Sequence, residues 1–191
     1  MLATVILWRQ SEDRHLAEGY SKRDAGIVLA GGCSSRMGRS KALLPYKDGL
    51  LHQHMSRMLR EAGLGHVYLS GEVPGAEAIP DRHLHAGPAQ AIADLLEKFS
   101  GIYDRLLVVP VDMPLLTADV LTHLQQQPGS SYFIRHPLPV CLRTGKVEGE
   151  VRSVRDLIAA CAALPLDLPE AWKPAMQNFN TPEEWAGACG F

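Results

Sequence analysis

A short apolar run that ends in a glycine-rich, basic loop is the feature that most constrains this chain. The run covers residues 26–30, and with its loop it reads GIVLAGGCSSRMGRSKALLPYKD over residues 26–48. Continuous apolar runs of this length are typical of strands buried on both faces of a parallel sheet. Glycines allow a ligand to approach the backbone closely, and a lysine such as Lys41 supplies a compact positive charge. The stretch therefore predicts a strand followed by a loop that binds a polyphosphate.

The spacing within the loop excludes two common nucleotide-binding motifs. Five residues separate Gly32 from Gly38, and Lys41 is not adjacent to the second glycine, so the loop is not a Walker A motif. It does not fit the GxGxxG dinucleotide fingerprint either. An ordinary glycine-rich surface loop is the alternative, but the cations Arg36, Arg39 and Lys41 directly after a buried-type strand favour a site for phosphates.

Strand-like and helix-like segments alternate along most of the chain. Strands are predicted over residues 26–30, 66–70, 105–111, 131–136, 139–142 and 175–179. Helices are predicted over residues 51–62, 88–99, 153–163 and 182–189, with another capped by Thr117, and a loop over residues 164–174. This alternation predicts an α/β fold with a mainly parallel sheet and helices on both faces, in which ligands bind beyond the carboxyl ends of the strands.

Length and composition limit the remaining possibilities. The 191 residues fit one domain over residues 26–191, preceded by an N-terminal extension over residues 1–25 without an assigned role. The net charge of −2 gives no footprint for nucleic acid, and no apolar run approaches the roughly 18 residues that span a membrane. The four cysteines lack CxxC spacing, which favours reduced thiols and a cytoplasmic protein.

The loop resembles the signature of the nucleotidyltransferases of molybdenum cofactor biosynthesis, most closely the molybdenum cofactor guanylyltransferases (MobA-like NTP transferases). Three further stretches agree in order and approximate spacing: Gly87-Pro88, the strand end VVPVDMP with Asp112, and NFNTPEEW from Asn178. The resemblance covers about residues 26–186 and implies a three-layer Rossmann-like nucleotidyltransferase fold. The implied reaction transfers GMP from Mg-GTP to molybdenum-molybdopterin and releases pyrophosphate. Molybdoenzymes or other cofactor-handling proteins are implied as further partners.

The resemblance also implies roles for individual residues. It places nucleotide contacts at Leu29, Ala30, Gly31, Gly32, Lys41, Ser70, Asp81, Gly87 and Asp112. The catalytic residues are expected to be Arg36, Lys41 and Asp112. The two cations would offset charge on the leaving pyrophosphate, and the carboxylate would bind Mg²⁺. The backbone N–H groups of residues 30–32 are expected to hold the nucleotide phosphates.

Several of these residues have simpler alternative interpretations. Asn178 and Asn180 are candidate second-substrate contacts, whereas a turn and N-cap for the final helix would explain Asn180 without a function. Asp81 fits a solvated loop carboxylate as well as a nucleotide contact. Asp112 could be a turn residue before a proline, although its place at the tip of a buried strand favours a metal ligand. The His-x-His pairs, His52/His54 and His83/His85, are interpreted as ordinary histidines because no further ligands stand at familiar spacing.

Departures from the family pattern leave other functions open. Ala89-Gln90-Ala91 replaces the usual residues after Gly87-Pro88, and a cation group could meet the acceptor phosphate or form a solvated face. That group comprises Arg135, Arg143, Lys146, Arg152 and Arg155. The alternatives are a molybdenum cofactor cytidylyltransferase, a sugar-phosphate nucleotidylyltransferase and a non-catalytic homologue that binds the cofactor. Gly31 within LAGG and the DMP strand end favour guanine over cytosine.

Overall fold

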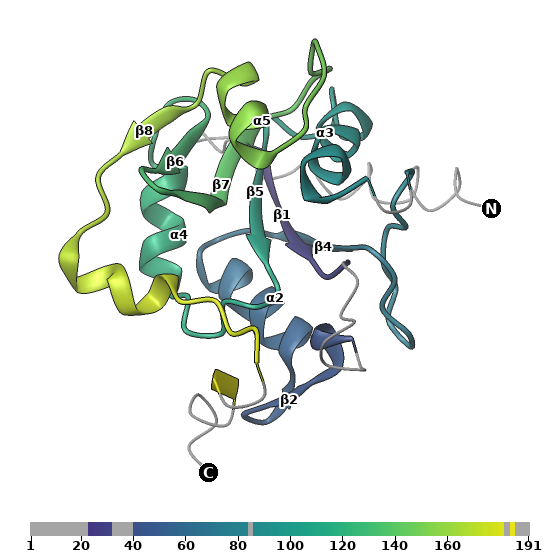
Figure 1. Ribbon diagram of the computed structural model, residues 1–191, viewed down its shortest axis with the longest axis vertical. Helices are drawn as coiled ribbons and strands as arrows, with labels where there is room; N and C mark the ends of the chain where they lie inside the picture. Colours follow the sequence, from purple (N-terminus) through teal and green to yellow (C-terminus); the bar gives the residue numbers. More distant parts are fainter. Residues whose placement is uncertain (1–22, 32–39, 84–85, 182–183, 186–191) are drawn as a thin grey trace, which may run out of the picture.

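The computed structural model describes residues 23–31, 40–83, 86–181 and 184–185. Its centre is a six-stranded sheet with the strand order β4-β1-β5-β7-β6-β8 (Figure 1). The strands are β1 (Asp24–Leu29), β4 (His66–Ser70), β5 (Arg105–Pro110), β6 (Ser131–Phe133), β7 (His136–Arg143) and β8 (Leu164–Leu166). Within this sheet β7 is antiparallel to β5 and β6, and the other pairings are parallel. The predicted mainly parallel sheet is therefore confirmed.

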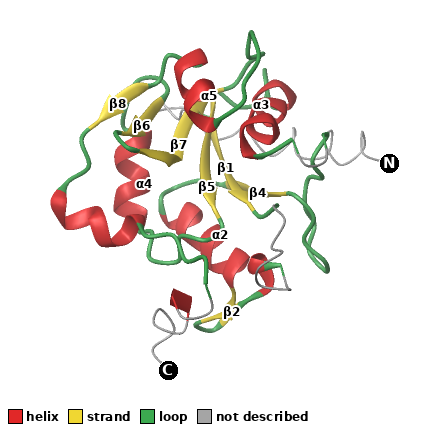
Figure 2. Ribbon diagram, in the orientation of Figure 1, coloured by secondary structure: helices red, strands yellow, loops and turns green. Residues whose placement is uncertain are grey.

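Helices cover both faces of the sheet and complete three layers (Figure 2). They are α2 (Leu51–Glu61), α3 (Pro88–Lys98), α4 (Ala118–Gln125) and α5 (Val154–Ala160). Leu107 and Val109 of β5 lie in the core formed with α2 and α4, whereas Leu106 and Val108 lie in the core formed with α3 and α5. This alternation follows from the two-residue period of a strand and shows why β5 is apolar along its length.

The remaining elements are short and lie around the carboxyl ends of the central strands. They are the 3₁₀ helices η2 (Lys41–Leu43) and η3 (Glu170–Met176) and the hairpin of β2 (Pro45–Tyr46) and β3 (Gly49–Leu50). No helix in the described ranges has the length and apolar character needed to cross a bilayer.

A buried ion pair lies at the opposite end of the sheet, where β1 and β5 begin. Arg105, which is 2% exposed, donates through Nε and Nη2 to the carboxylate of Asp24. Its guanidinium also donates to the carbonyl oxygens of Gln125 (2.8 Å), Gln127 (2.6 Å) and Gly129 (3.2 Å). One side chain thereby joins the start of β1, the start of β5 and the end of α4.

Two predicted segments differ in the structure. Residues 164–166 form β8 and not a loop, because the free edge of β6 accepts a parallel partner through bonds such as Leu164 N–H to Ser130 O (2.8 Å). Residues 175–179 form no strand: η3 runs to Met176, and Phe179 N–H then donates to Asp112 O (2.8 Å).

Element boundaries also shift by a few residues. β1 begins at Asp24. The two prolines of β7 lie before Val140, where the pairing of β7 with β5 starts. These prolines therefore interrupt no hydrogen bond between β5 and β7. Ser153 and Asp156 form the predicted capping box of α5. Thr117 occupies the N-cap of α4 but makes no side-chain capping bond. Residues 1–22 and most of the predicted helix over 182–189 lie outside the described residues.

Candidate active site

A cleft of about 590 Å³ opens beyond the carboxyl ends of β1 and β5. Its walls come from six separate segments of the chain. They are Leu29, Ala30, Gly31, Lys41, Pro88, Pro110, Val111, Asp112, Arg135, His136, Pro137, Leu138, Met176 and Asn178. The position agrees with the general rule for ligand sites in open α/β sheets.

Lys41 and Asp112 form an ion pair in this cleft. Lys41 begins η2, Asp112 follows β5, and 3.3 Å separate Lys41 Nζ from Asp112 Oδ2. The two side chains are 18% and 20% exposed, so both charges are only partly hydrated. Charges that are partly removed from water interact more strongly than charges on an open surface.

The C-terminal segment completes the surroundings of Lys41. Lys41 Nζ donates to Asn180 Oδ1 (2.7 Å) and to Phe179 O (3.2 Å). Phe179 N–H in turn donates to the backbone oxygen of Asp112 (2.8 Å), so this segment bridges the two charged residues. The contact of Asn180 is with Lys41, so this predicted second-substrate residue lies beside the lysine that is predicted to be catalytic.

A capping interaction and a ring contact hold this C-terminal segment in place. Glu184 accepts hydrogen bonds from the N–H groups of Asn180 (2.6 Å) and Thr181 (3.1 Å). These two bonds hold the pKa of the Glu184 carboxyl below its usual value. The Trp185 ring stacks on Tyr46, with 5.7 Å between the ring centroids.

Two glycines allow β1 and β4 to approach closely at the cleft. Gly71 has a φ of +106°, and a Cβ placed on it would lie 2.4 Å from the Cα and N atoms of Gly31. The N–H groups of Ala30 (2.8 Å) and Gly31 (3.0 Å) both donate to Ser70 O. These two N–H groups are therefore engaged within the protein, contrary to the expectation that they hold phosphates.

Asp81 lies against this pair of strand ends. A Cβ on Gly31 would lie 3.1 Å from Asp81 Oδ2, and Ser70 Oγ donates to Asp81 Oδ1 at 3.5 Å. Ser70 is 3% exposed, so its side chain serves to place Asp81 and presents little surface to a ligand. Three predicted nucleotide contacts, Gly31, Ser70 and Asp81, thus meet at one place.

The other predicted residues are distributed around this centre. Gly87 has a φ of +84° and precedes Pro88, which begins α3 and lines the cleft. Asn178 lines the cleft as well. Gly32 and Arg36 lie outside the described residues, and so do Cys33 and His85.

Three of the four histidines in the two His-x-His pairs, His52, His54 and His83, lie in the described part of the chain. His52 and His54 are 8% and 3% exposed, and burial lowers the pKa of both rings. His54 Nε2 lies 2.9 Å from Pro114 O, and His83 Nδ1 lies 3.1 Å from Asp94 Oδ2. No group of three or more His, Cys, Asp or Glu in the described parts of the chain could hold a metal ion. The carboxylate of Asp112 still fits Mg²⁺, which commonly takes one or two carboxylates and obtains other ligands from phosphates and water.

The start of β7 forms a wall of the cleft that no local sequence pattern predicts. Val140 pairs with Val108, so the residues preceding Val140 lie beside the carboxyl end of β5. This register brings His136, Pro137 and Leu138 into the cleft. Register cannot be read from one strand alone, and the Pro137 and Pro139 pattern was the only signal that this part of the strand lies outside the regular pairing.

Comparison with known proteins identifies the family. Residues 26–164 match the family described as the MobA-like NTP transferase domain. The chain belongs to this family. A molybdenum cofactor guanylyltransferase of Xanthomonas euvesicatoria pv. vesicatoria is 38% identical over 84% of this chain and 92% of that protein. A probable molybdenum cofactor guanylyltransferase of Mycobacterium avium is 34% identical over 82% and 90%.

Solved structures support the same fold for this MobA-like chain. The molybdopterin-guanine dinucleotide biosynthesis protein A of Archaeoglobus fulgidus superimposes with a TM-score of 0.65 at 19% identity. The match covers 87% of this chain and 97% of that protein. The predicted family and nucleotidyltransferase fold are therefore confirmed.

Proposed function

We propose that this protein transfers GMP from Mg-GTP to molybdenum-molybdopterin, forming the guanine dinucleotide cofactor and releasing pyrophosphate. The observation that carries the proposal is the Lys41–Asp112 pair in a cleft at the carboxyl ends of β1 and β5. The relatives named as molybdenum cofactor guanylyltransferases, which align over most of this chain, support the substrates.

The charged residues suit nucleotidyl transfer. Attack on the α-phosphorus brings several anionic oxygens together, so the protein must mainly position them and offset their charge. Lys41 would turn its ammonium group to the leaving pyrophosphate, and Arg36 is proposed to act beside it. Asp112 would hold Mg²⁺, which when bound neutralises phosphate charge. Leu29, Ala30 and Gly31 line the cleft and would contact the nucleotide, and Asn178, which lines the same cleft, would contact the acceptor.

Asp81 favours guanine as the base. Guanine presents neighbouring N–H donors on its Watson–Crick edge, and an ionised carboxylate only accepts hydrogen bonds. Gly31 leaves room for this carboxylate, because a side chain there would lie 3.1 Å from Asp81 Oδ2. Selection of CTP in place of GTP is the alternative function.

Parallel transfer assays with GTP, CTP and ATP test the proposal. The purified protein, Mg²⁺ and molybdenum-loaded molybdopterin should give the guanine dinucleotide with GTP and little product with the other two nucleotides. A preference for CTP would replace guanylyl by cytidylyl transfer. GTP binding without any product would instead support a non-catalytic homologue.

A cytoplasmic location and transfer of the product to molybdoenzymes or other cofactor-handling proteins remain parts of the proposal. The free thiol of Cys161 fits that location.

A further inference from the structure

Tyr46 connects the three segments of the chain that surround the Lys41–Asp112 pair. It lies in β2, which follows η2 and its Lys41. Its hydroxyl group donates a hydrogen bond to Pro114 O (3.3 Å), in the segment that follows Asp112. Its ring stacks on Trp185 of the C-terminal segment, with 5.7 Å between the ring centroids. One side chain, which is 4% exposed, thus contacts the segments of both charged residues and the segment that bridges them.

These contacts form a closed path around Asp112. The Trp185 ring lies edge-on against the ring of Phe179, with 6.0 Å between the centroids. Phe179 N–H donates to Asp112 O (2.8 Å), and Phe179 O accepts a hydrogen bond from Lys41 Nζ (3.2 Å). A path of direct contacts therefore leaves the backbone of Asp112, passes through the two rings to Tyr46, and returns to the segment that follows Asp112.

A second donor holds the carbonyl group of Pro114. His54 Nε2 lies 2.9 Å from Pro114 O, and because a carbonyl oxygen only accepts hydrogen bonds, Nε2 carries the hydrogen. The other ring nitrogen, Nδ1, is buried without a hydrogen-bond partner among the described residues. The ring of His54 also contacts the ring of Tyr46 edge to face, with 4.6 Å between the centroids. Two donors from different elements thus restrain the backbone beyond Asp112.

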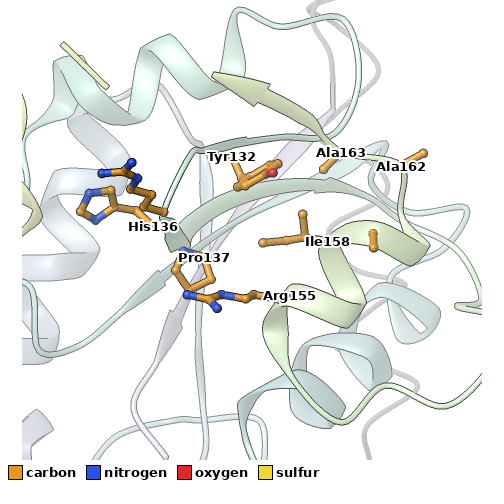
Figure 3. Close-up of a pocket in the computed structure, with 9 residues that line it drawn as sticks. Tyr132, His136, Pro137, Arg155, Ile158, Ala162 and Ala163 are labelled. Carbon is orange, nitrogen blue, oxygen red and sulfur yellow. The ribbon is translucent and has the colours of Figure 1, made fainter. Parts of the chain in front are cut away.

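None of these side chains belongs to a cavity wall. Within the described part of the chain, the residues that line the cleft do not include Tyr46, His54 or Trp185. The residues that line the neighbouring hollow between α5 and the turn from β6 to β7 do not include them either (Figure 3). A ligand in either cavity would therefore meet Lys41 and Asp112 without touching these side chains, so any effect of Tyr46 on the reaction must pass through other residues.

We propose that Tyr46 is a positioning residue, which keeps the carboxylate of Asp112 and the ammonium group of Lys41 in one fixed relative geometry. The inference rests on the proposed function, since it assigns no contact with a substrate to Tyr46 itself. Placement matters because a displacement of about 1 Å at the reacting groups can lower a rate by about 10²-fold. A tyrosine suits this task because its ring packs among apolar neighbours while its hydroxyl group reaches a polar partner.

Tyr46→Phe tests the role of the hydroxyl group. The variant keeps the ring stack on Trp185 and loses the hydrogen bond to Pro114 O. We expect kcat for GMP transfer to fall by about tenfold, with little change in the KM for GTP or in the melting temperature. Tyr103→Phe is the matched control, because the hydroxyl group of Tyr103 lies 2.7 Å from that of Tyr68 and neither residue lines the cleft. Equal kcat values for the two variants would overturn the proposal.

Trp185→Leu tests the other end of the path. Loss of the ring stack should lower kcat by a factor similar to that of Tyr46→Phe, whereas Trp185→Tyr keeps an aromatic ring and should retain most of the activity. Wild-type kcat in Trp185→Leu would contradict the proposal.

A double variant shows whether Tyr46 acts through Lys41. Asn180 Oδ1 accepts a hydrogen bond from Lys41 Nζ, so loss of either Asn180 or the Tyr46 hydroxyl group should disturb the same geometry. Tyr46→Phe combined with Asn180→Ala should therefore lower kcat by less than the product of the two single effects. Effects that multiply would mean that the two residues act independently and would contradict the proposal.

Hydrogen exchange separates this inference from the proposed reaction. The Phe179 N–H, which donates to Asp112 O, reports whether the two segments stay together in the protein without substrates. Its exchange, followed by NMR, should become about tenfold faster in Tyr46→Phe and stay unchanged in Tyr103→Phe. The N–H of Val108, at the centre of the sheet, should exchange equally slowly in both variants. This pattern without any GMP transfer would mean that only the proposed function fails. Unchanged exchange at Phe179 in Tyr46→Phe contradicts the inference whatever the transfer assay shows.

Discussion

Lys41 Nζ lies 3.3 Å from Asp112 Oδ2, although 71 positions of sequence separate the two residues. Each partner offsets the charge of the other at a place where both are largely shielded from water. A nucleotide and its metal would meet the same two groups, so the pair also marks where the proposed chemistry occurs.

Removing either charge should affect turnover more than folding. We expect Lys41→Met and Asp112→Asn each to lower kcat for GMP transfer by about 10²–10³-fold, the size expected for a group that stabilises transition-state charge. Steady-state kinetics with GTP would measure the change. Lys98→Met, at the exposed end of α3, is the control and should retain wild-type rates. Full activity of Asp112→Asn would remove this residue from the metal site.

Asn180 should act through Lys41. Its Oδ1 accepts a hydrogen bond of 2.7 Å from Lys41 Nζ, and a bond to a charged group is worth about 1.5–3 kcal/mol. Asn180→Ala is therefore expected to lower kcat by about tenfold or more with little change in the KM for the acceptor. A rise in that KM without a fall in kcat would instead identify Asn180 as a second-substrate contact.

The buried pair of Asp24 and Arg105 should contribute to stability and not to catalysis. Asp24→Ala leaves a buried guanidinium with no carboxylate, which typically costs about 3–5 kcal/mol of unfolding free energy. Urea denaturation would measure the loss, and the folded fraction should keep its activity. Glu150→Ala breaks the exposed pair with Arg152 and should change the stability by less than about 1 kcal/mol.

Stability should fall in mildly acidic solution because of His54. Burial lowers the pKa of this ring in the folded protein, while the unfolded chain takes up the proton near the ordinary value of 6.5. Below that pH the unfolded chain binds more protons, so the unfolding free energy decreases until the folded ring is protonated too. Denaturation curves between about pH 8 and about pH 5 would show the loss, and His54→Gln should flatten it. His52, whose pKa is also lowered by burial, contributes in the same direction.

The strand and helix order could be predicted because each segment carries its own signal. β5 is a continuous apolar run, α2 has one apolar face, and Ser153 with Asp156 gives the start of α5. β8 has no such signal, since only the free edge of β6 makes residues 164–166 a strand. The strand predicted over residues 175–179 is wrong, because the conformation of this segment depends on contacts with Asp112 and Lys41.

Only the part of the site that follows from the order of the strands could be predicted from the sequence. Lys41 and Asp112 stand next to recognisable strands, so topology alone brings them to one edge of the sheet. The engagement of the Ala30 and Gly31 N–H groups by Ser70 O depends on how closely β1 and β4 approach. The place of Arg135 in the wall of the cleft depends on the register of β7. Neither relationship is encoded in a local pattern.

The hydrogen bond from Lys41 to Asn180 spans 139 positions of sequence. During synthesis, β1, β4 and β5 can leave the ribosome and pair well before Asn180 is added to the chain. We therefore expect tight nucleotide binding to appear only after Asn180 has been synthesised. GTP would then stabilise the finished protein by mass action but would give little help to its folding intermediates.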